Sequence, residues 1–294
     1  MIRKLGLIFA AVLIATLEIR GLAQESLSTI QVKVRLVEVN ATVLDHKGIF
    51  VDGLRPDNFQ ILENGQPQRI STFESNVDAL SCAILLDTTG SMREALPSVK
   101  NAVVKLIDQL EPQDSVAIFT FDRQLTVRQD FTSDKNAAKR AVLRTRAEGS
   151  TALFDAISEA SEELAKRRGK KALIVFTDGD DNSSQLTAHG AAAHAQRLGI
   201  PLYAIAEGEA TQSAALGKLL NELSERTGGV AYRVKKTDEI EQVFAAIASD
   251  LRHLYLISYK PTDSREDGKW RKIDIVVNGV QNYRLRAKQG YFPD

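Results

Sequence analysis

The chain has 294 residues, and its 38 lysines and arginines balance its 38 aspartates and glutamates, so the formal net charge is zero. Hydrophobic residues make up 44% and charged residues 26%, which is typical of a globular protein with a sizeable core. These values exclude wholesale disorder and a polytopic membrane protein. No segment carries the clustered cationic excess of a nucleic-acid-binding protein, so we expect no nucleic acid among the partners.

The first 24 residues have the pattern of a secretory signal peptide. Arg3 and Lys4 precede an apolar run over 5–17, and small residues follow at Gly21 and Ala23, where signal peptides are cleaved. The run is shorter than the ~20 apolar residues that a membrane-spanning helix needs. We therefore expect an exported protein, periplasmic or extracellular, with no membrane span once residues 1–24 are removed.

Residues 25–78 carry the signals of β-strands. Apolar and polar residues alternate over 32–43, and the alternation changes phase near Leu36, which predicts a bulge or break there. The sequences Asp45–Gly48 and Glu63–Gln66 predict turns between strands. The second signal is the stronger one, because both residues of Asn-Gly tolerate positive φ.

Short apolar runs alternate with segments of helical periodicity between residues 79 and 252. The expected strands are 82–86, 116–121, 173–176, 202–206 and 230–234, with 125–131 as a half-buried edge strand. Amphipathic helices are predicted between them, the last over 238–251. This alternation predicts an α/β fold, with a doubly wound, mostly parallel sheet that helices cover on both faces. Cys82, the single cysteine, is expected to be a small core residue.

Residues 253–294 return to β-strand signals. Alternation over 273–277 and again over 283–287, with Asn278-Gly279 between them, predicts a hairpin. Each flank of the α/β segment is too short to close a core alone. We therefore expect the flanks 25–78 and 253–294 to pack together into one small β-module.

Oxygen-bearing side chains stand at the carboxyl ends of two predicted strands. The run 82–86 leads into Asp87-Thr88-Thr89-Gly90-Ser91, after which we expect a helix to begin. The run 173–176 leads into Thr177-Asp178, and Thr151 opens another helix. In an α/β sheet, such strand ends form the ligand crevice where the strand order reverses. If the first and fourth strands are neighbours, the side chains that converge are those of Asp87, Thr89, Ser91, Thr151 and Asp178.

These five side chains are hard oxygen ligands with only two carboxylates, a set that suits Mg²⁺ or Mn²⁺. Two carboxylates roughly neutralise a divalent cation, so the cation can still accept an Asp or Glu carboxylate of a protein partner. Each residue also has a simpler explanation. Ser91 with Glu94 can form a capping box, Thr151 can be an N-cap, and Asp178 can belong to a turn. Only the combination of three loops favours the metal site.

The pattern resembles the von Willebrand factor A domain and its metal-ion-dependent adhesion site. The signature of that site is Asp-x-Ser-x-Ser with a separate Thr and a separate Asp, and here it reads 87–91 with Thr151 and Asp178. The similarity covers about residues 79–252. The two flanks look like those of bacterial secreted proteins related to A domains. Thr89 departs from the usual Ser of the family, because it keeps the hydroxyl but adds a methyl group.

The resemblance implies a role for each ligand. Thr89 and Ser91 would bind the metal directly, and Thr151 would bind it directly or through water. Asp87 and Asp178 would act mainly through water.

The leading hypothesis is an exported, non-enzymatic adhesion module that captures an acidic group of a protein partner through the bound cation. One alternative is a structural component of the cell envelope whose metal never meets a ligand. The other is a Mg²⁺-dependent phosphohydrolase with Asp87 as nucleophile, but Thr89 stands where a second Asp would be needed. Glycine-rich phosphate loops and a Gly-x-Ser-x-Gly elbow are also missing from the sequence, so we expect no enzymatic activity.

Overall fold

The structure is a computed structural model, and it describes residues 36–75, 79–147, 151–178, 181–207, 213–234 and 239–293. The predicted signal peptide and the residues just before Leu36 lie outside the described residues. Within these ranges, no helix combines the length and the apolar character needed to cross a membrane.

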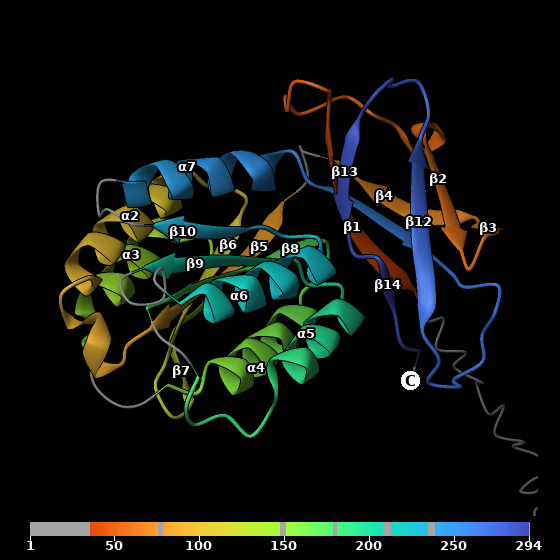
Figure 1. The fold of residues 1–294 in the computed structure, drawn as a ribbon. Coiled ribbons are helices and arrows are strands. Elements are labelled where there is room, and N and C mark those ends of the chain that lie inside the picture. Colours follow the sequence, from red (N-terminus) through yellow and green to blue (C-terminus); the bar gives the residue numbers. More distant parts are fainter. Residues whose placement is uncertain are drawn as a thin grey trace, which may run out of the picture. The chain divides into compact units, whose positions relative to one another are not determined.

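Among the described residues, a six-stranded sheet with the order β10-β9-β8-β5-β6-β7 forms the centre of the α/β domain (Figure 1). The strands are β5 (Leu80–Asp87), β6 (Ser115–Phe121), β7 (Leu125–Thr132), β8 (Lys170–Thr177), β9 (Leu202–Glu207) and β10 (Ala231–Val234). Only β7 runs antiparallel to its neighbour, β6, and the other pairs are parallel. All six strands coincide with predicted ones. The pairing of β5 with β8 is the neighbourhood on which the predicted convergence of site residues depends.

Helices cover both faces of this sheet, because its strands are apolar on both sides. One layer contains α2 (Leu96–Gln109), α3 (Lys135–Arg144) and α7 (Glu239–Arg252). The other contains α4 (Leu153–Ala165), α5 (Ala188–Arg197) and α6 (Ala214–Thr227). Side chains of β5 alternate between the layers: Ile84 packs with the first and Leu85 with the second. Cys82 is fully buried in the first layer, and burial raises the pKa of its thiol to about 12.

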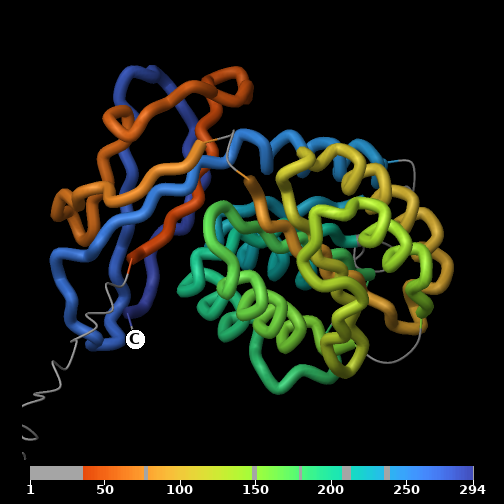
Figure 2. The backbone as a smooth tube through the Cα atoms, turned by 180° about the vertical axis from the view of Figure 1, so that it is seen from behind, coloured from red at the N-terminus to blue at the C-terminus, as the bar shows by residue number. Residues whose placement is uncertain are grey.

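The two flanks of the chain form two further sheets, with the orders β13-β1-β11-β4 and β14-β12-β2-β3 among the described residues. Their strands are β1 (Val37–Leu44), β2 (Phe59–Glu63), β3 (Gln66–Gln68), β4 (Ile70–Glu74), β11 (Tyr255–Tyr259), β12 (Arg271–Val277), β13 (Arg284–Ala287) and β14 (Gly290–Tyr291). Strand β1 pairs with β11 and β13, and β2 pairs with β12, so each sheet joins both flanks. Figure 2 shows the orange N-terminal and blue C-terminal strands side by side. The prediction of one β-module from both flanks is confirmed.

The turn at Asn64 and Gly65 is confirmed, and the hairpin predicted around Asn278-Gly279 is wrong. Asn64 and Gly65 have φ values of 49° and 80° and connect the paired strands β2 and β3. By contrast, β12 pairs with β2 and β14, whereas β13 pairs with β1 in the other sheet. The chain crosses between the sheets after Asn278, whose N–H donates to Asn58 O at 2.7 Å. Alternation predicts which face of a strand is buried, but it does not predict the strand's partner.

Candidate metal centre

The candidate site lies where β5 and β8 end. Asp87 is the last residue of β5 and is fully buried, and Asp178 follows β8 directly and is 7% exposed. The two strands are parallel neighbours, with Leu86 opposite Phe176. Their carboxyl ends therefore bring the loops that carry the two aspartates to the same edge of the sheet.

Hydrogen bonds join four of the five predicted site residues. Asp87 Oδ1 accepts from Thr89 N at 2.9 Å. The Thr89 hydroxyl lies 3.0 Å from the Ser91 hydroxyl, which donates to Asp178 Oδ1 at 2.9 Å. The result is one cluster of two carboxylates and two hydroxyls. Asp87, Thr89 and Asp178 are buried and Ser91 is exposed, so the cluster is reached from the Ser91 side.

Thr151, the fifth predicted residue, is held beside the loop that follows β8. It is 5% exposed, its N–H donates to Asn182 Oδ1 at 3.2 Å, and its carbonyl accepts from Asn182 N at 3.0 Å. Within the described part of the chain, no hydrogen bond joins Thr151 to the other four residues. The N-cap of α4 is Ala152, so Thr151 does not have the simple capping role that was its alternative.

The capping-box explanation of Ser91 is wrong. A short 3₁₀ helix, η2 (Gly90–Arg93), follows β5, and α2 begins only at Leu96 with Ala95 as an N-cap that makes no side-chain cap bond. The Ser91 hydroxyl points to Asp178 instead of a helix amide. The predicted helix start directly after Ser91 is corrected for the same reason, because the 3₁₀ turn lies between the site loop and α2.

Burial governs the electrostatics of Asp87. Burial is the largest cause that raises the pKa of its carboxyl, hydrogen bonds from Thr89 and Thr177 lower the pKa, and the like charge of Asp178 adds a smaller rise. The net result is a pKa of about 6. The Thr177 hydroxyl donates to Asp87 Oδ2 at 2.8 Å. The sequence does not single out Thr177. Its position at the end of a strand beside β5 is the signal that points to it once the strand order is known.

The donor set fits a divalent cation. Carboxylate and hydroxyl oxygens are the ligands that Mg²⁺ and Mn²⁺ prefer. Two carboxylates held near each other in a buried cluster repel, and a cation with two charges would remove that repulsion. Among the described residues, no group of three or more His, Cys, Asp or Glu side chains is arranged to hold a metal, so the hydroxyls are needed to complete the donor set.

We expect Asp87→Asn to stabilise the metal-free protein. The pKa of Asp87 rises from 3.8 to about 6 on folding. The charged carboxylate therefore lowers the free energy of unfolding at high pH, and this destabilisation disappears as the pH falls and the carboxyl of the folded protein is protonated. Each pKa unit corresponds to about 1.4 kcal/mol, so the variant should gain roughly 1–3 kcal/mol at about pH 8 and little at about pH 4. Urea unfolding in EDTA at both pH values measures this. An equal change in the free energy of unfolding at both pH values would contradict the raised pKa of Asp87.

A Ser–His–Glu arrangement lies elsewhere, between α4 and α5. Ser158 Oγ is 2.5 Å from His194 Nδ1, and Glu162 Oε1 is 3.5 Å from His194 Nε2. Sequence patterns do not reveal it, because the residues come from two helices. Ser158 is 5% exposed in the middle of α4, and none of the three residues lines a pocket described below. The arrangement therefore gives a substrate no access to the hydroxyl.

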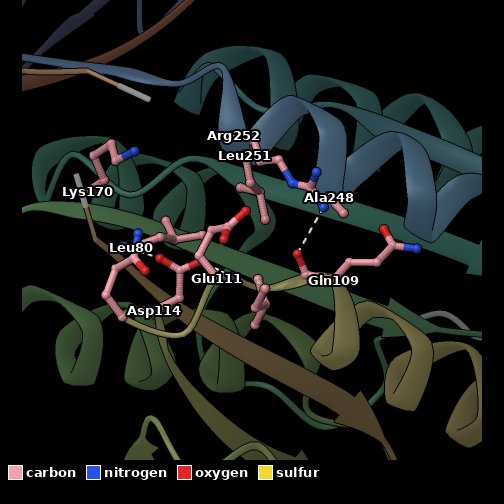
Figure 3. Close-up of a pocket in the computed structure, with 10 residues that line it drawn as sticks. Leu80, Gln109, Glu111, Asp114, Lys170, Ala248, Leu251 and Arg252 are labelled. Atoms are coloured by element: carbon pink, nitrogen blue, oxygen red, sulfur yellow. Dashed lines mark hydrogen bonds between the residues drawn. The ribbon is translucent and has the colours of Figure 1, made fainter. Parts of the chain in front are cut away.

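A pocket at the opposite edge of the sheet is too small for a ligand. It lies at the amino-terminal ends of β5 and β8, between Leu80, Asp114 and Lys170 on one side and the end of α7 on the other (Figure 3). Arg252 Nη2 closes it by donating to Gln109 O at 2.9 Å. Its volume is about 20 Å³, which is room for about one water molecule.

The chain belongs to the von Willebrand factor type A domain family. The sequence model of that family matches residues 82–246, which are more than half of the chain. The matched range begins inside β5 and ends inside α7, so it contains the whole candidate site. The family resemblance seen in the sequence is thereby confirmed.

Two curated proteins are similar to parts of the chain. An uncharacterized protein of Synechocystis is 32% identical over 107 residues, which are 35% of this chain and 26% of that protein. An inter-alpha-trypsin inhibitor heavy chain of Bos taurus is 27% identical over 139 residues, 40% of this chain and 15% of that protein. The chain thus spans about a quarter or less of the length of these relatives.

Solved structures share the fold. A von Willebrand factor type A protein from Catenulispora acidiphila has a TM-score of 0.53 at 14% identity. The matched region covers 90% of this chain and 76% of that protein's chain. Proximal thread matrix protein 1 of the mussel byssus has a TM-score of 0.54 at 18% identity, with coverages of 64% and 49%, and its metal-ion-dependent adhesion motif is occupied by zinc. At these identities the likeness concerns the fold alone.

Proposed function

We propose that this protein is an exported, non-enzymatic binding module that captures an acidic group of a protein partner through a bound divalent cation, Mg²⁺ or Mn²⁺. The observation that carries the proposal is the hydrogen-bonded cluster of two carboxylates and two hydroxyls at the ends of β5 and β8. It lies in a domain whose fold is shared with a protein that holds zinc at its adhesion motif. Export rests on the signal-peptide pattern of residues 1–24.

The residues of the cluster would have different roles in binding the cation. When bound, the cation supplies an electrophilic position for an outside carboxylate. The hydroxyls of Thr89 and Ser91 would hold it, with Thr151 as the proposed further ligand. Asp87 and Asp178 would supply the balancing charge, and the Thr177 hydroxyl keeps the Asp87 carboxylate oriented. Because only Ser91 is exposed, the partner would approach from its side of the cluster.

Metal binding is tested by calorimetric titration of EDTA-treated protein with Mg²⁺ and Mn²⁺. We expect saturable binding that Asp87→Ala and Asp178→Ala both abolish. Asp274→Ala is the matched control, because its carboxylate lies on the β-module and pairs with Lys272 at the surface. Binding that both site variants retain would contradict the proposal.

Carboxylate capture is tested with two short peptides with blocked ends, one with a single Glu and its twin with Gln. We expect NMR shifts of the protein with the Glu peptide in Mg²⁺, and none in EDTA or with the Gln peptide. Binding of metal without any response to the Glu peptide would support the alternative, a structural protein whose metal meets no ligand.

A further inference from the structure

Four arginines from a strand, a helix and the loop after it gather on one surface beside the candidate metal centre. We call it the arginine surface: Arg128 of β7, Arg140 and Arg144 of α3, and Arg146 just after α3. Two pockets lie on it, one of about 380 Å³ and one of about 330 Å³, and both are lined by Arg128 and Arg144. All four arginines are exposed.

The second of these pockets reaches the loops of the metal centre. Thr88, which stands between two predicted site residues, and Asp122 complete its lining. The N–H and hydroxyl of Thr88 both donate to Phe121 O at 3.0 Å. The carbonyl of Asp122 accepts from Ala152 N at 2.8 Å, next to Thr151. A ligand that fills this pocket therefore touches the same loops as a ligand of the cation.

The charges of Arg144 and Arg146 are not paired within the described part of the fold. Cations often stand at a helix C-terminus to satisfy its carbonyls, but Lys100 already does this for α3, because its Nζ donates to the carbonyls of Leu143 and Thr145. Within the described residues, Arg144 and Arg146 form no ion pair.

The other two arginines are only loosely engaged. Among the residues that the structure describes, Arg128 makes a single hydrogen bond, from Nε to Thr120 Oγ1 at 2.9 Å, which leaves its terminal N–H groups for a ligand. Arg140 meets Asp134 at 3.9 Å with both side chains exposed, a geometry that contributes little.

Like charges also meet at this surface. The pKa of Lys100 is lowered by burial and, after that, by the positive charge of Arg146. A nearby anion would relieve this repulsion.

We propose that the arginine surface is the second contact of the partner, and that it binds acidic side chains that flank, in one protein segment, the carboxylate captured by the cation. This rests on the proposed function. Guanidinium groups bind carboxylates through two parallel hydrogen bonds. Asp122 lines the second pocket, and its negative charge disfavours a dense polyanion such as a sulfated glycan, whereas a protein segment can place an uncharged residue there. The partner class is therefore an acidic protein segment, not an isolated acidic residue.

The test measures fluorescence anisotropy of a labelled oligoglutamate peptide with blocked ends, in Mg²⁺ and in EDTA. The variant is Arg144→Glu with Arg146→Glu. The matched control is Arg168→Glu with Lys218→Glu, which makes the same change in net charge at two exposed positions away from the pockets. We expect the first variant to bind the peptide about tenfold or more weakly than the unchanged protein, and the control variant to lose much less affinity.

The outcomes separate the two proposals. Binding that needs Mg²⁺ and weakens only in Arg144→Glu with Arg146→Glu supports both. Binding that needs Mg²⁺ but is equal in both variants overturns the inference and leaves the proposed function standing. Binding that weakens only in that variant but ignores Mg²⁺ supports the arginine surface and counts against capture by the cation. No peptide binding, or tighter binding of a heparin fragment, overturns the inference.

Discussion

Replacing Glu63 by alanine is expected to lower the free energy of unfolding by about 3–5 kcal/mol. The change removes the buried carboxylate that pairs with Arg271 and accepts from two tyrosine hydroxyls, and among the described residues it leaves Arg271 only the more exposed carboxylate of Asp263 as an ion-pair partner. Glu63 and Arg271 are each 3% exposed, and Arg271 Nη1 lies 3.3 Å from Glu63 Oε1. The other carboxylate oxygen accepts from the hydroxyls of Tyr259 at 2.7 Å and Tyr291 at 3.0 Å. One side chain thus ties together β2, β11, β12 and β14, and joins both sheets of the β-module.

Urea unfolding of the purified protein measures this effect. The matched control is Asp274→Ala, which removes a carboxylate on β12 whose pair with Lys272 is largely exposed, at 41% and 62%. That variant should change the free energy of unfolding by less than about 1 kcal/mol. If Glu63→Ala is no less stable than Asp274→Ala, the buried ion pair does not hold the β-module together.

Arg286→Ala is expected to lower the free energy of unfolding by about 2–4 kcal/mol, because it removes the ion-pair partner of a buried carboxylate at the contact between the β-module and the α/β domain. The side chain of Asp250, near the end of α7, is 2% exposed and forms an ion pair with Arg286 of β13. It also accepts from the Tyr203 hydroxyl of β9 at 2.5 Å. Without Arg286, a buried carboxylate would keep only neutral donors, and its desolvation would weaken the fold.

Urea unfolding again gives the measurement, with Arg284→Ala as the control because Arg284 is an exposed arginine on the same strand. The double variant Asp250→Ala with Arg286→Ala should be more stable than the sum of the single changes implies, because the two residues are coupled. Strictly additive effects would show that the pair contributes nothing as a pair.

Much of the fold follows from the sequence because burial leaves a periodic pattern. Each strand of the central sheet is a short apolar run, and α2 or α7 repeats apolar residues at helical spacing, so their existence and type are predicted. The pairing of strands in the β-module is not predicted by this pattern. The alternation in β12 and β13 is the same whether they pair with each other or, as found, with β2 and β1.

The site divides in the same way. Asp87 and Asp178 were predictable, because a strand-end rule places them and the order of β5 and β8 brings them together. The hydrogen bond between Ser91 and Asp178 was not predicted. The strand ends predict that the two side chains converge, but a capping box explains Ser91 equally well in sequence. The arginine surface was not predicted. Arg140, Arg144 and Arg146 are close in sequence, but Arg128 belongs to β7 and joins them only because α3 packs beside β7.

The most direct test of the central claim is anomalous scattering from crystals of the protein grown with Mn²⁺. We predict an anomalous peak bounded by the side chains of Thr89, Ser91 and Asp178, which disappears when the same crystals are washed with EDTA. Crystals of Asp178→Ala under the same conditions should show no peak there. Saturating Mn²⁺ with no peak at these residues, or with a peak only elsewhere on the chain, would contradict the assignment of a metal centre to the ends of β5 and β8.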